Sequence, residues 1–169
     1  DIGTDHAYIP IWLAENGRIM GAVAMDVNRG PLERAEENIR EHGLEDRICT
    51  RLSDGFAALE PGEADCAVIA GMGGGLTVRI LKEGMGLVRT LKECILQPQS
   101  EIEKVRAFLL EEGFLFISED MVEEDGKYYP MMKLACPGRK ERLITDEDPP
   151  AGDRRENDWD ETELLYGRY

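Results

Sequence analysis

The sequence predicts an α/β fold with a mostly parallel sheet, helices on both faces and an antiparallel hairpin at the end. Short apolar stretches of strand length alternate with amphipathic stretches of helix length over residues 7–112. Two further strand-like stretches then flank Glu124-Asp125-Gly126, which is typical of a hairpin turn. With 169 residues, of which 42% are hydrophobic, the chain is long enough to form one well-buried domain.

The first half of the chain predicts the end of a first strand just before Gly3, followed by two helices and three further strands. In order, we expect a helix over residues 7–16, a strand over 20–25, a helix over 32–42, and strands over 47–52 and 64–70. Pro10 and Pro31 fall near the first turns of the two helices, where proline is tolerated. Gly17 and Gly43 follow the helices and mark their ends.

The second half predicts two more helices, a fifth parallel strand and the hairpin. A helix is expected over residues 76–82, broken by Gly84 and Gly86, and a strand over 93–96. Ser100 and Glu103 have the spacing of a capping box, which predicts a helix from there to residue 112. The hairpin strands are expected over residues 114–123 and 127–136.

Composition argues against several classes of protein. No apolar run approaches the roughly 20 residues needed to span a bilayer. The four cysteines form no CxxC pair and the two histidines lie far apart, so we expect no metal site and a reduced, cytoplasmic protein. Cys66 and Cys94 lie in apolar runs and are interpreted as small packed hydrophobes. The net charge of −15 argues against a nucleic-acid partner, and residues 146–163 form a dense acidic stretch.

Glycines and carboxylates recur where the predicted parallel strands end. Because these ends meet at one edge of a parallel sheet, they predict a ligand site at that edge. The residues concerned are Gly3, Asp5, Asp26, Asp54, Gly55 and the glycines from Gly71 to Gly75, with Gln97 and Pro98 after the fifth strand.

Asp26 and Asp54 are candidates for holding a nucleoside. Asp26 lies about twenty residues beyond the first glycine turn, where a carboxylate accepts hydrogen bonds from ribose hydroxyls. The alternative is a helix-capping or solvated aspartate, and we favour ribose binding. Asp54 suits an acceptor for an adenine amino group, but an ordinary Asp-Gly turn explains it equally well.

The glycine-rich stretch after the fourth strand favours close approach of a ligand. Gly71, Gly73 and Gly74 carry no side chains that would exclude it, so backbone groups are accessible. The alternative is a flexible loop. Met72 could pack against a flat base, although a place in the core is the simpler interpretation.

Asp5 is the candidate catalytic residue. It replaces the second glycine of a dinucleotide fingerprint, and the third glycine is absent, which disfavours NAD binding. An aspartate at this turn could orient, or take a proton from, a nucleophilic nitrogen. It could equally be the N-cap of the following helix. His6 and Tyr8 are candidates for contact with substrate or cofactor, and Lys127 and Tyr128 form either a substrate lip or a plain solvated turn.

Four motifs occur together in a fixed order: Asp1-Ile-Gly-Thr-Asp-His-Ala-Tyr-Ile-Pro10, Ile69-Ala-Gly-Met-Gly-Gly74, Leu96-Gln-Pro98 and Glu124-Asp-Gly-Lys-Tyr128. This set resembles the bacterial TrmK family, the tRNA (adenine-22, N1) methyltransferases. The resemblance covers the chain up to about Cys136. It implies the seven-stranded, Rossmann-like sheet of class I methyltransferases, which the closing hairpin also favours over a dinucleotide-binding domain.

The resemblance also implies S-adenosyl-L-methionine as cofactor and tRNA as substrate. The cofactor would be held by Asp1, Gly3, Asp26, Val27, Asp54, Gly55, Ala70, Gly71, Met72 and Gly73. Asp5, His6 and Tyr8 would lie at the reactive centre, with Asp5 as the catalytic carboxylate. Gln97, Pro98, Lys127 and Tyr128 would contact the substrate.

The resemblance implies that the chain has two parts. Residues 1–138 are expected to form the cofactor-binding domain, without most of the first strand, which would precede Asp1. Residues 139–169 are expected to form an acidic linker and the start of a helical domain. Other interpretations stay open: a methyltransferase acting on a small molecule or a protein, which the acidic surface would suit, or a non-catalytic cofactor-binding module. A NAD-dependent oxidoreductase is the weakest of them.

Overall fold

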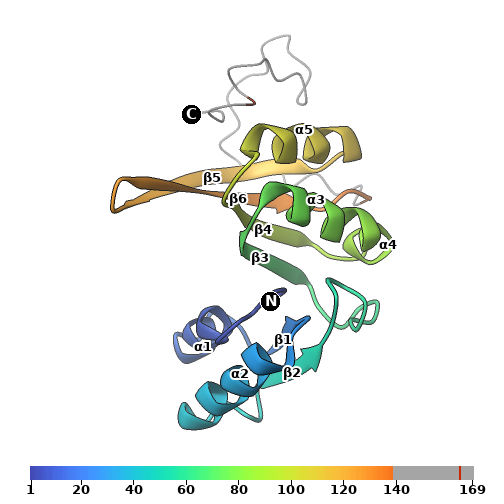
Figure 1. Ribbon diagram of the computed structural model, residues 1–169. Helices are drawn as coiled ribbons and strands as arrows, with labels where there is room; N and C mark the ends of the chain where they lie inside the picture. The colour runs from blue at the N-terminus through green and yellow to red at the C-terminus, as the bar shows by residue number, and fades with distance from the viewer. Residues whose placement is uncertain (139–163, 165–169) are drawn as a thin grey trace.

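The computed structural model describes residues 1–138 and residue 164. It has an α/β architecture in which helices and strands alternate before a closing hairpin (Figure 1). The strands are β1 (Ala22–Asp26), β2 (Ile48–Leu52), β3 (Cys66–Met72), β4 (Glu93–Pro98), β5 (Leu115–Glu124) and β6 (Lys127–Ala135). The helices are α1 (Tyr8–Glu15), α2 (Arg29–Glu41), α3 (Gly74–Glu83), α4 (Met85–Val88) and α5 (Ile102–Glu112).

Ile2 joins two groups of strands. β1 pairs in parallel with β2, and a four-stranded group has the order β3-β4-β6-β5. In that group β3 and β4 are parallel, whereas β6 is antiparallel to both of its neighbours. Ile2 makes parallel bridges to Met25 of β1 and Ile69 of β3. The parallel strands and terminal hairpin confirm the Rossmann-like prediction, but the structure describes six strands in two groups rather than one seven-stranded sheet.

Helices cover both faces of the strands, and β1 shows how the alternation of side chains divides the core. Ala24 packs into a cluster with buried residues of α1 and α2. The next residue, Met25, is buried in the larger cluster formed by α3, α5 and the four-stranded group. In α2 the predicted apolar face is confirmed, since the residues buried there are Leu32, Ala35 and Ile39.

The start of α5 differs from the prediction. The helix begins at Ile102 after Glu101, without a side-chain cap, so the predicted capping box at Ser100 and Glu103 is wrong. Instead, the Ser100 Oγ and Glu101 Oε2 atoms accept hydrogen bonds from the backbone of Gly74 and Gly75, at 3.3 and 3.2 Å. These residues therefore satisfy N–H groups at the start of α3, a neighbouring helix.

The α3 helix ends where the sequence predicts. Glu83 is its last residue and Gly84 follows as the C-cap, so the predicted break at Gly84 is confirmed. The second predicted breaker, Gly86, instead lies inside the short helix α4. A four-residue helix costs little to form around one glycine when its other residues pack against the core, as Val88 does here.

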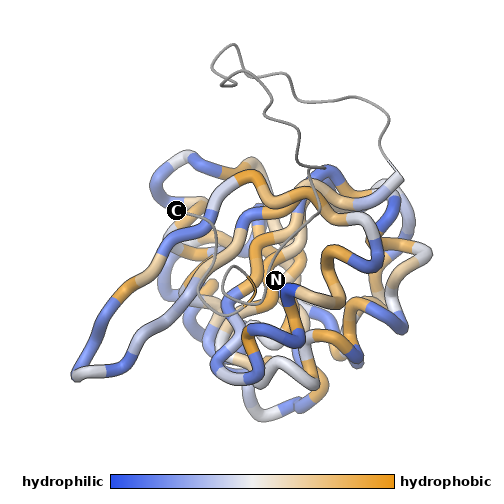
Figure 2. The backbone as a smooth tube through the Cα atoms, turned by 90° about the horizontal axis from the view of Figure 1, so that it is seen from above, coloured by the Kyte–Doolittle hydropathy of each residue, from blue (hydrophilic) through white to orange (hydrophobic). Residues whose placement is uncertain are grey.

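The hairpin turns on Asp125 and Gly126 and projects beyond the other strands (Figure 1). Both residues have positive φ angles, +51° and +74°, which is typical of a two-residue type I′ turn. The tip is coloured mostly as hydrophilic in Figure 2. The prediction of a hairpin at this position is confirmed, with strand ends that differ by one residue.

The cysteines divide into two kinds. Cys94 and Cys136 are buried with their sulfur atoms 3.3 Å apart, and the hydrogen bond between them, together with burial, raises the pKa of the Cys94 thiol. Cys94 therefore stays a protonated, packed side chain, as predicted. Cys66 is exposed at the start of β3, so its predicted packing is wrong.

Two kinds of feature are absent from residues 1–138 and residue 164. Among those residues no group of three or more His, Cys, Asp and Glu side chains is arranged to hold a metal ion. No helix in the same described part is both long and apolar enough to cross a membrane.

Candidate cofactor and substrate site

The loop between Ile2 and α1 is held tightly against β1. The backbone N–H groups of Gly3 and Thr4 both donate to the carbonyl of Met25, at 2.8 and 2.9 Å. Two residues that are not glycine, Asp5 and Ala7, have positive φ angles of +50° and +59°. Such left-handed backbone in ordinary residues is strained and is found where the surrounding structure fixes it, often at functional sites.

Asp26 connects this loop to the end of β1. Its side chain is buried, and its two carboxylate oxygens accept hydrogen bonds from the backbone of Asn28 at 2.9 Å and Asp5 at 3.4 Å. A carboxylate has about four acceptor positions, so it retains capacity for the two hydroxyls of a ribose. The neighbouring Val27 side chain is 58% exposed and offers an apolar surface on which a flat base could pack. The geometry fits the predicted nucleoside site.

Asp5, His6 and Tyr8 lie together at the mouth of this loop. The Asp5 Oδ2 and His6 Nε2 atoms are 3.6 Å apart. The His6 and Tyr8 rings are stacked, with centroids 5.2 Å apart and an interplanar angle of 4°. Helix α1 has Ala7 at its N-cap and no side-chain cap, so the alternative interpretation of Asp5 as a helix cap is wrong. Its carboxylate is exposed and available to a substrate.

The glycine-rich stretch at the end of β3 approaches the same loop. A Cβ atom on Gly3 would lie 2.1 Å from the Met72 side chain, so only glycine allows this contact without movement. Gly71 has a φ angle of +76°, and its N–H donates to the Gln97 side chain at 2.9 Å. Gln97 therefore holds the glycine turn in place. Met72 packs partly against the core, as the simpler interpretation had it.

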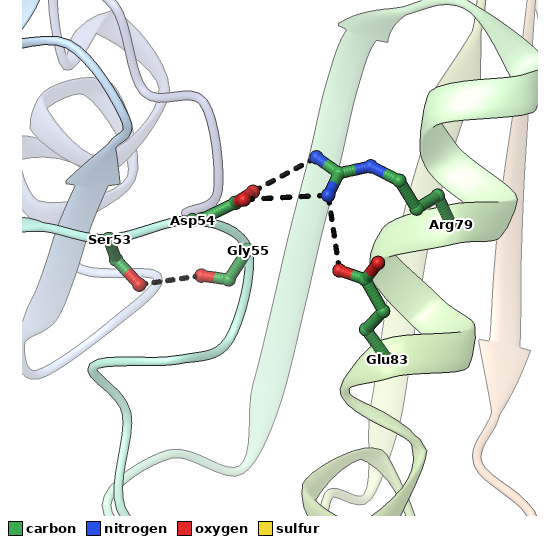
Figure 3. A network of polar contacts seen from close by, with 5 residues as sticks. All are labelled: Ser53, Asp54, Gly55, Arg79 and Glu83. Atoms are coloured by element: carbon green, nitrogen blue, oxygen red, sulfur yellow. Dashed lines mark hydrogen bonds and ion pairs between the residues drawn. The ribbon is translucent and has the colours of Figure 1, made fainter.

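Asp54 takes part in a network that the sequence did not predict (Figure 3). The Arg79 guanidinium contacts both Asp54 oxygens, at 3.0 and 3.4 Å, and also Glu83 at 3.1 Å. These carboxylates raise the pKa of Arg79, which stays charged. A cavity of about 350 Å³ opens beside Asp54 and Gly55 and continues between Phe56 and α3. Asp54 thus has an ordering partner and faces open space.

The predicted site residues fall into two groups. In the first group, direct contacts connect the loops that start at Gly3, Asp26, Gly71 and Gln97. The Asp54 turn belongs to this group as well, because the Ser53 N–H donates to the carbonyl of Asp26 at 2.9 Å. Lys127 and Tyr128 form the second group and lie at the exposed hairpin tip.

The hairpin register relates Lys127 and Tyr128 to the site. Leu96 pairs with Met132, and β4 ends at Pro98. Lys127 therefore lies three positions beyond the end of β4, or about 10 Å at strand spacing. It projects past the edge at which the parallel strands end.

The sequence analysis did not identify three residues that support the site. Asn38 of α2 donates to the carbonyl of His6 at 2.8 Å, and Glu101 supports the start of α3. The Lys104 ammonium, together with the Gly75 N–H, holds the pKa of Glu101 below its usual range, so Glu101 stays an acceptor. Arg79 was signalled only by its helical spacing from Glu83, which does not reveal its contact with Asp54.

The chain is similar to known methyltransferases. Residues 1–132 match the family described as a methyltransferase domain. The tRNA (adenine(22)-N(1))-methyltransferase of Bacillus subtilis is 38% identical over 132 residues, which cover 78% of this chain and 56% of that protein. The chain thus spans little more than half the length of this relative.

Two solved structures carry bound cofactor or cofactor product. A Streptococcus pneumoniae protein solved in complex with S-adenosyl-L-methionine is 34% identical, with a TM-score of 0.82 and coverage of 100% of this chain and 71% of that one. TrmK of M. capricolum, solved in complex with S-adenosyl-homocysteine, is 26% identical, with a TM-score of 0.78 and coverage of 99% of this chain and 67% of that one. On the domain match and these relatives, the chain belongs to the TrmK family of methyltransferases.

Proposed function

We propose that the protein transfers a methyl group from S-adenosyl-L-methionine to N1 of adenine 22 in bacterial tRNA. The observation that carries the proposal is the direct linkage of the loops after Ile2, β1, β3 and β4 around Asp26 and Gly71. In open α/β sheets this edge is where a nucleotide-like ligand binds. The name of the Bacillus subtilis relative supplies the reaction and the methylated position.

The cofactor would lie across these loops. Asp26 would accept hydrogen bonds from the ribose hydroxyls, and Asp54, oriented by Arg79, would accept one from the adenine amino group. Val27 would pack against the adenine ring. Asp1, Gly3, Gly55 and residues 70–73 would line the remainder through backbone groups. The bound cofactor supplies an activated methyl group on a sulfonium.

The protein's own residues would position the substrate adenine. N1 of adenine is a modest nucleophile, so alignment with the methyl group contributes much of the rate. The base must also leave its stack before it can enter the site. Asp5 would accept a hydrogen bond from the adenine amino group and stabilise the positive charge that develops on the ring. His6 lies close enough to Asp5 to orient it, and Tyr8 supports the His6 ring.

Other assignments belong to the same proposal. We infer that the segment at Ile2 is the end of a seventh strand between β1 and β3, which gives the strand order of class I methyltransferases. Residues 1–138 would form the catalytic domain, and 139–169 a linker and the start of a helical domain. Gln97 and Pro98 would lie beside the target base, and Lys127 and Tyr128 would form a lip that contacts RNA. A tRNA substrate implies a cytoplasmic protein.

The test is transfer of labelled methyl from S-adenosyl-L-methionine to unmodified tRNA transcripts. One transcript has adenine at position 22 and its matched control has guanine there. We expect label only in the first, and mapping of the product to 1-methyladenine. Because the chain spans 56% of its Bacillus subtilis relative, a chain of the relative's length is assayed in parallel.

The outcomes separate the candidate functions. Transfer by the longer chain alone would mean that tRNA binding depends on segments outside this sequence. Failure of both chains to label tRNA, while S-adenosyl-homocysteine still binds, would contradict the proposal. It would favour a small-molecule or protein substrate, for which the net charge of −15 is the supporting observation.

A further inference from the structure

Helix α1 exposes a row of large apolar side chains. Tyr8 is 66% exposed, Ile9 41% and Trp12 57%. Tyr8 and Trp12 are four residues apart and therefore lie on one side of the helix, with Ile9 beside them. The opposite side of α1 packs into the protein through its buried residues, which are Pro10, Ile11 and Ala14. We call the exposed set, Tyr8, Ile9 and Trp12, the aromatic row.

The aromatic row is continuous with the candidate reactive centre. Tyr8 is stacked on His6, whose Nε2 lies 3.6 Å from the Asp5 carboxylate. Trp12 follows one helical turn later, which displaces it by about 6 Å along the axis. The exposed Tyr8 and Trp12 side chains therefore extend the surface of the candidate reactive centre along α1.

We propose that the aromatic row binds unpaired nucleobases that neighbour the base in the catalytic site. Bases that have left a helix stack on exposed Tyr, Trp and His rings, and this contact tolerates any base because each has a flat face. The parallel His6 and Tyr8 rings form one such surface, and Trp12 offers a second. The inference rests on the proposed function, since it assumes an RNA substrate.

The charge of the chain favours this mode of binding. With 35 acidic and 20 basic residues, the protein has few cations to spare for RNA phosphates. Beside the row, the carboxylate of Glu15 is paired with His42 at 2.7 Å rather than with a lysine or arginine. Stacking requires no cation, so it supplies affinity that the charge of the protein does not oppose.

The test uses the chain with Trp159→Phe, which leaves Trp12 as the one tryptophan of the sequence. We expect an unmodified tRNA transcript to quench Trp12 fluorescence on binding. Trp12→Ala in the unaltered chain should raise the Kd for tRNA about tenfold, since one stacked base is lost. Trp12→Phe should keep the Kd within about threefold of wild type because a ring remains. The Kd for S-adenosyl-homocysteine should not change in either variant.

A matched control removes an exposed apolar side chain elsewhere. Met20 is 92% exposed and precedes β1, at the opposite end of that strand from Asp26. Met20→Ala should therefore leave the Kd for tRNA unchanged. An equal rise in the Kd for tRNA in Met20→Ala and Trp12→Ala would overturn the proposal, because the loss of affinity would then be unspecific.

The remaining outcomes distinguish this inference from the proposed function. If adenine 22 is labelled but tRNA does not quench Trp12 and Trp12→Ala does not change the Kd for tRNA, the proposed role of the aromatic row is overturned. The proposed function is then left intact. Quenching of Trp12 by tRNA, without methyl transfer by this chain or by the longer one, would support the role of the aromatic row and contradict the proposed function. Emission from Trp12 that is blue-shifted before RNA is added, and unaffected by it, would show that a protein segment covers the row, and would overturn the inference.

Discussion

Asp5 combines an exposed carboxylate with a backbone that few residue types adopt. Its φ angle is +50°, a conformation that Asn tolerates as well as Asp does. Asp5→Asn therefore keeps the loop and its N–H contact with Asp26 while it removes the charge. We expect methyl transfer at saturating cofactor to fall at least tenfold, which corresponds to about 1.4 kcal/mol. The Kd for S-adenosyl-homocysteine, measured by calorimetry, should stay within about twofold.

Asp46→Asn is the matched control for Asp5. Asp46 is exposed in the turn after α2, so the same loss of one negative charge occurs away from the site. It should leave the transfer rate unchanged. If Asp5→Asn also transferred methyl at the wild-type rate, the catalytic role of Asp5 would be refuted.

Arg79 gives a second prediction at the scale of single residues. Its guanidinium holds both oxygens of Asp54, which faces the cavity where an adenine amino group is expected. In Arg79→Met the carboxylate loses this orientation, and we expect the Kd for S-adenosyl-homocysteine to rise about fivefold, as for about 1 kcal/mol of hydrogen bonding. The maximal rate with saturating cofactor should not change, because Arg79 does not contact the transferred group.

Glu83→Gln provides the graded comparison for Arg79. It removes one anchor of the guanidinium but leaves the contact with Asp54, so its Kd should lie between those of wild type and Arg79→Met. A cofactor analogue with inosine in place of adenosine lacks the amino group. If Arg79→Met weakened the binding of the adenosine cofactor and of the inosine analogue by the same factor, Arg79 would not act through Asp54.

At the scale of elements, α3 depends on a close contact with the start of α5. A Cβ atom on Gly74 would lie 2.3 Å from the carbonyl oxygen of Ser100, which is backbone and cannot move away alone. Gly74→Ala must therefore separate two elements, and we expect a loss of about 2–3 kcal/mol in the free energy of unfolding, as for overpacked cores. Urea denaturation followed by circular dichroism measures it.

Gly86→Ala is the control for that substitution. Gly86 lies inside the short helix α4, and an added Cβ would meet nothing within 4 Å. Alanine is a better helix former than glycine, so this variant should be equal to wild type or more stable by up to about 1 kcal/mol. The same sign of change in both variants would show that the contact at Ser100 is not what constrains Gly74.

The contact between Ser100 and Gly74 shows which features of the fold can be predicted from the sequence and which cannot. The predicted apolar face of α2 and the predicted turn at Asp125-Gly126 are confirmed, because both depend on neighbours within the element. Ser100 and Glu103 have the pattern of a capping box, but Ser100 instead meets the N–H of Gly74, 26 residues away. Asp54 and Arg79 are likewise 25 residues apart. Pairings at such separations leave no periodic signal in a single sequence.

At the scale of the whole molecule, the distribution of strands and helices brings distant loops to one edge. Residues of the first loop contact β1 and β3, and the turn after β3 is held by Gln97 of β4. The sequence predicted this edge because four strand ends carried glycine or carboxylate. It did not predict how the loops support one another, since that depends on the twist and register of the strands.

The net charge of −15 limits the electrostatic contribution to the binding of a polyanion such as tRNA. RNA binding that neutralises phosphates loses affinity steeply with salt, with a logarithmic slope of about −0.7 to −0.9 per phosphate contacted. Because 35 acidic residues outnumber 20 basic ones, we expect few such contacts and a slope shallower than about −2 between about 50 and 200 mM KCl. Filter binding with labelled tRNA measures this slope.

Trp12→Ala separates stacking from charge in the same titration. Stacking on Trp12 releases no counterions, so the variant should bind tRNA more weakly at every salt concentration while the slope stays that of wild type. A wild-type slope as steep as about −6 would mean that basic side chains neutralise many phosphates in spite of the net charge. Affinity would then depend on the lysines and arginines, such as Lys127 at the hairpin tip, and Trp12 would contribute little to it.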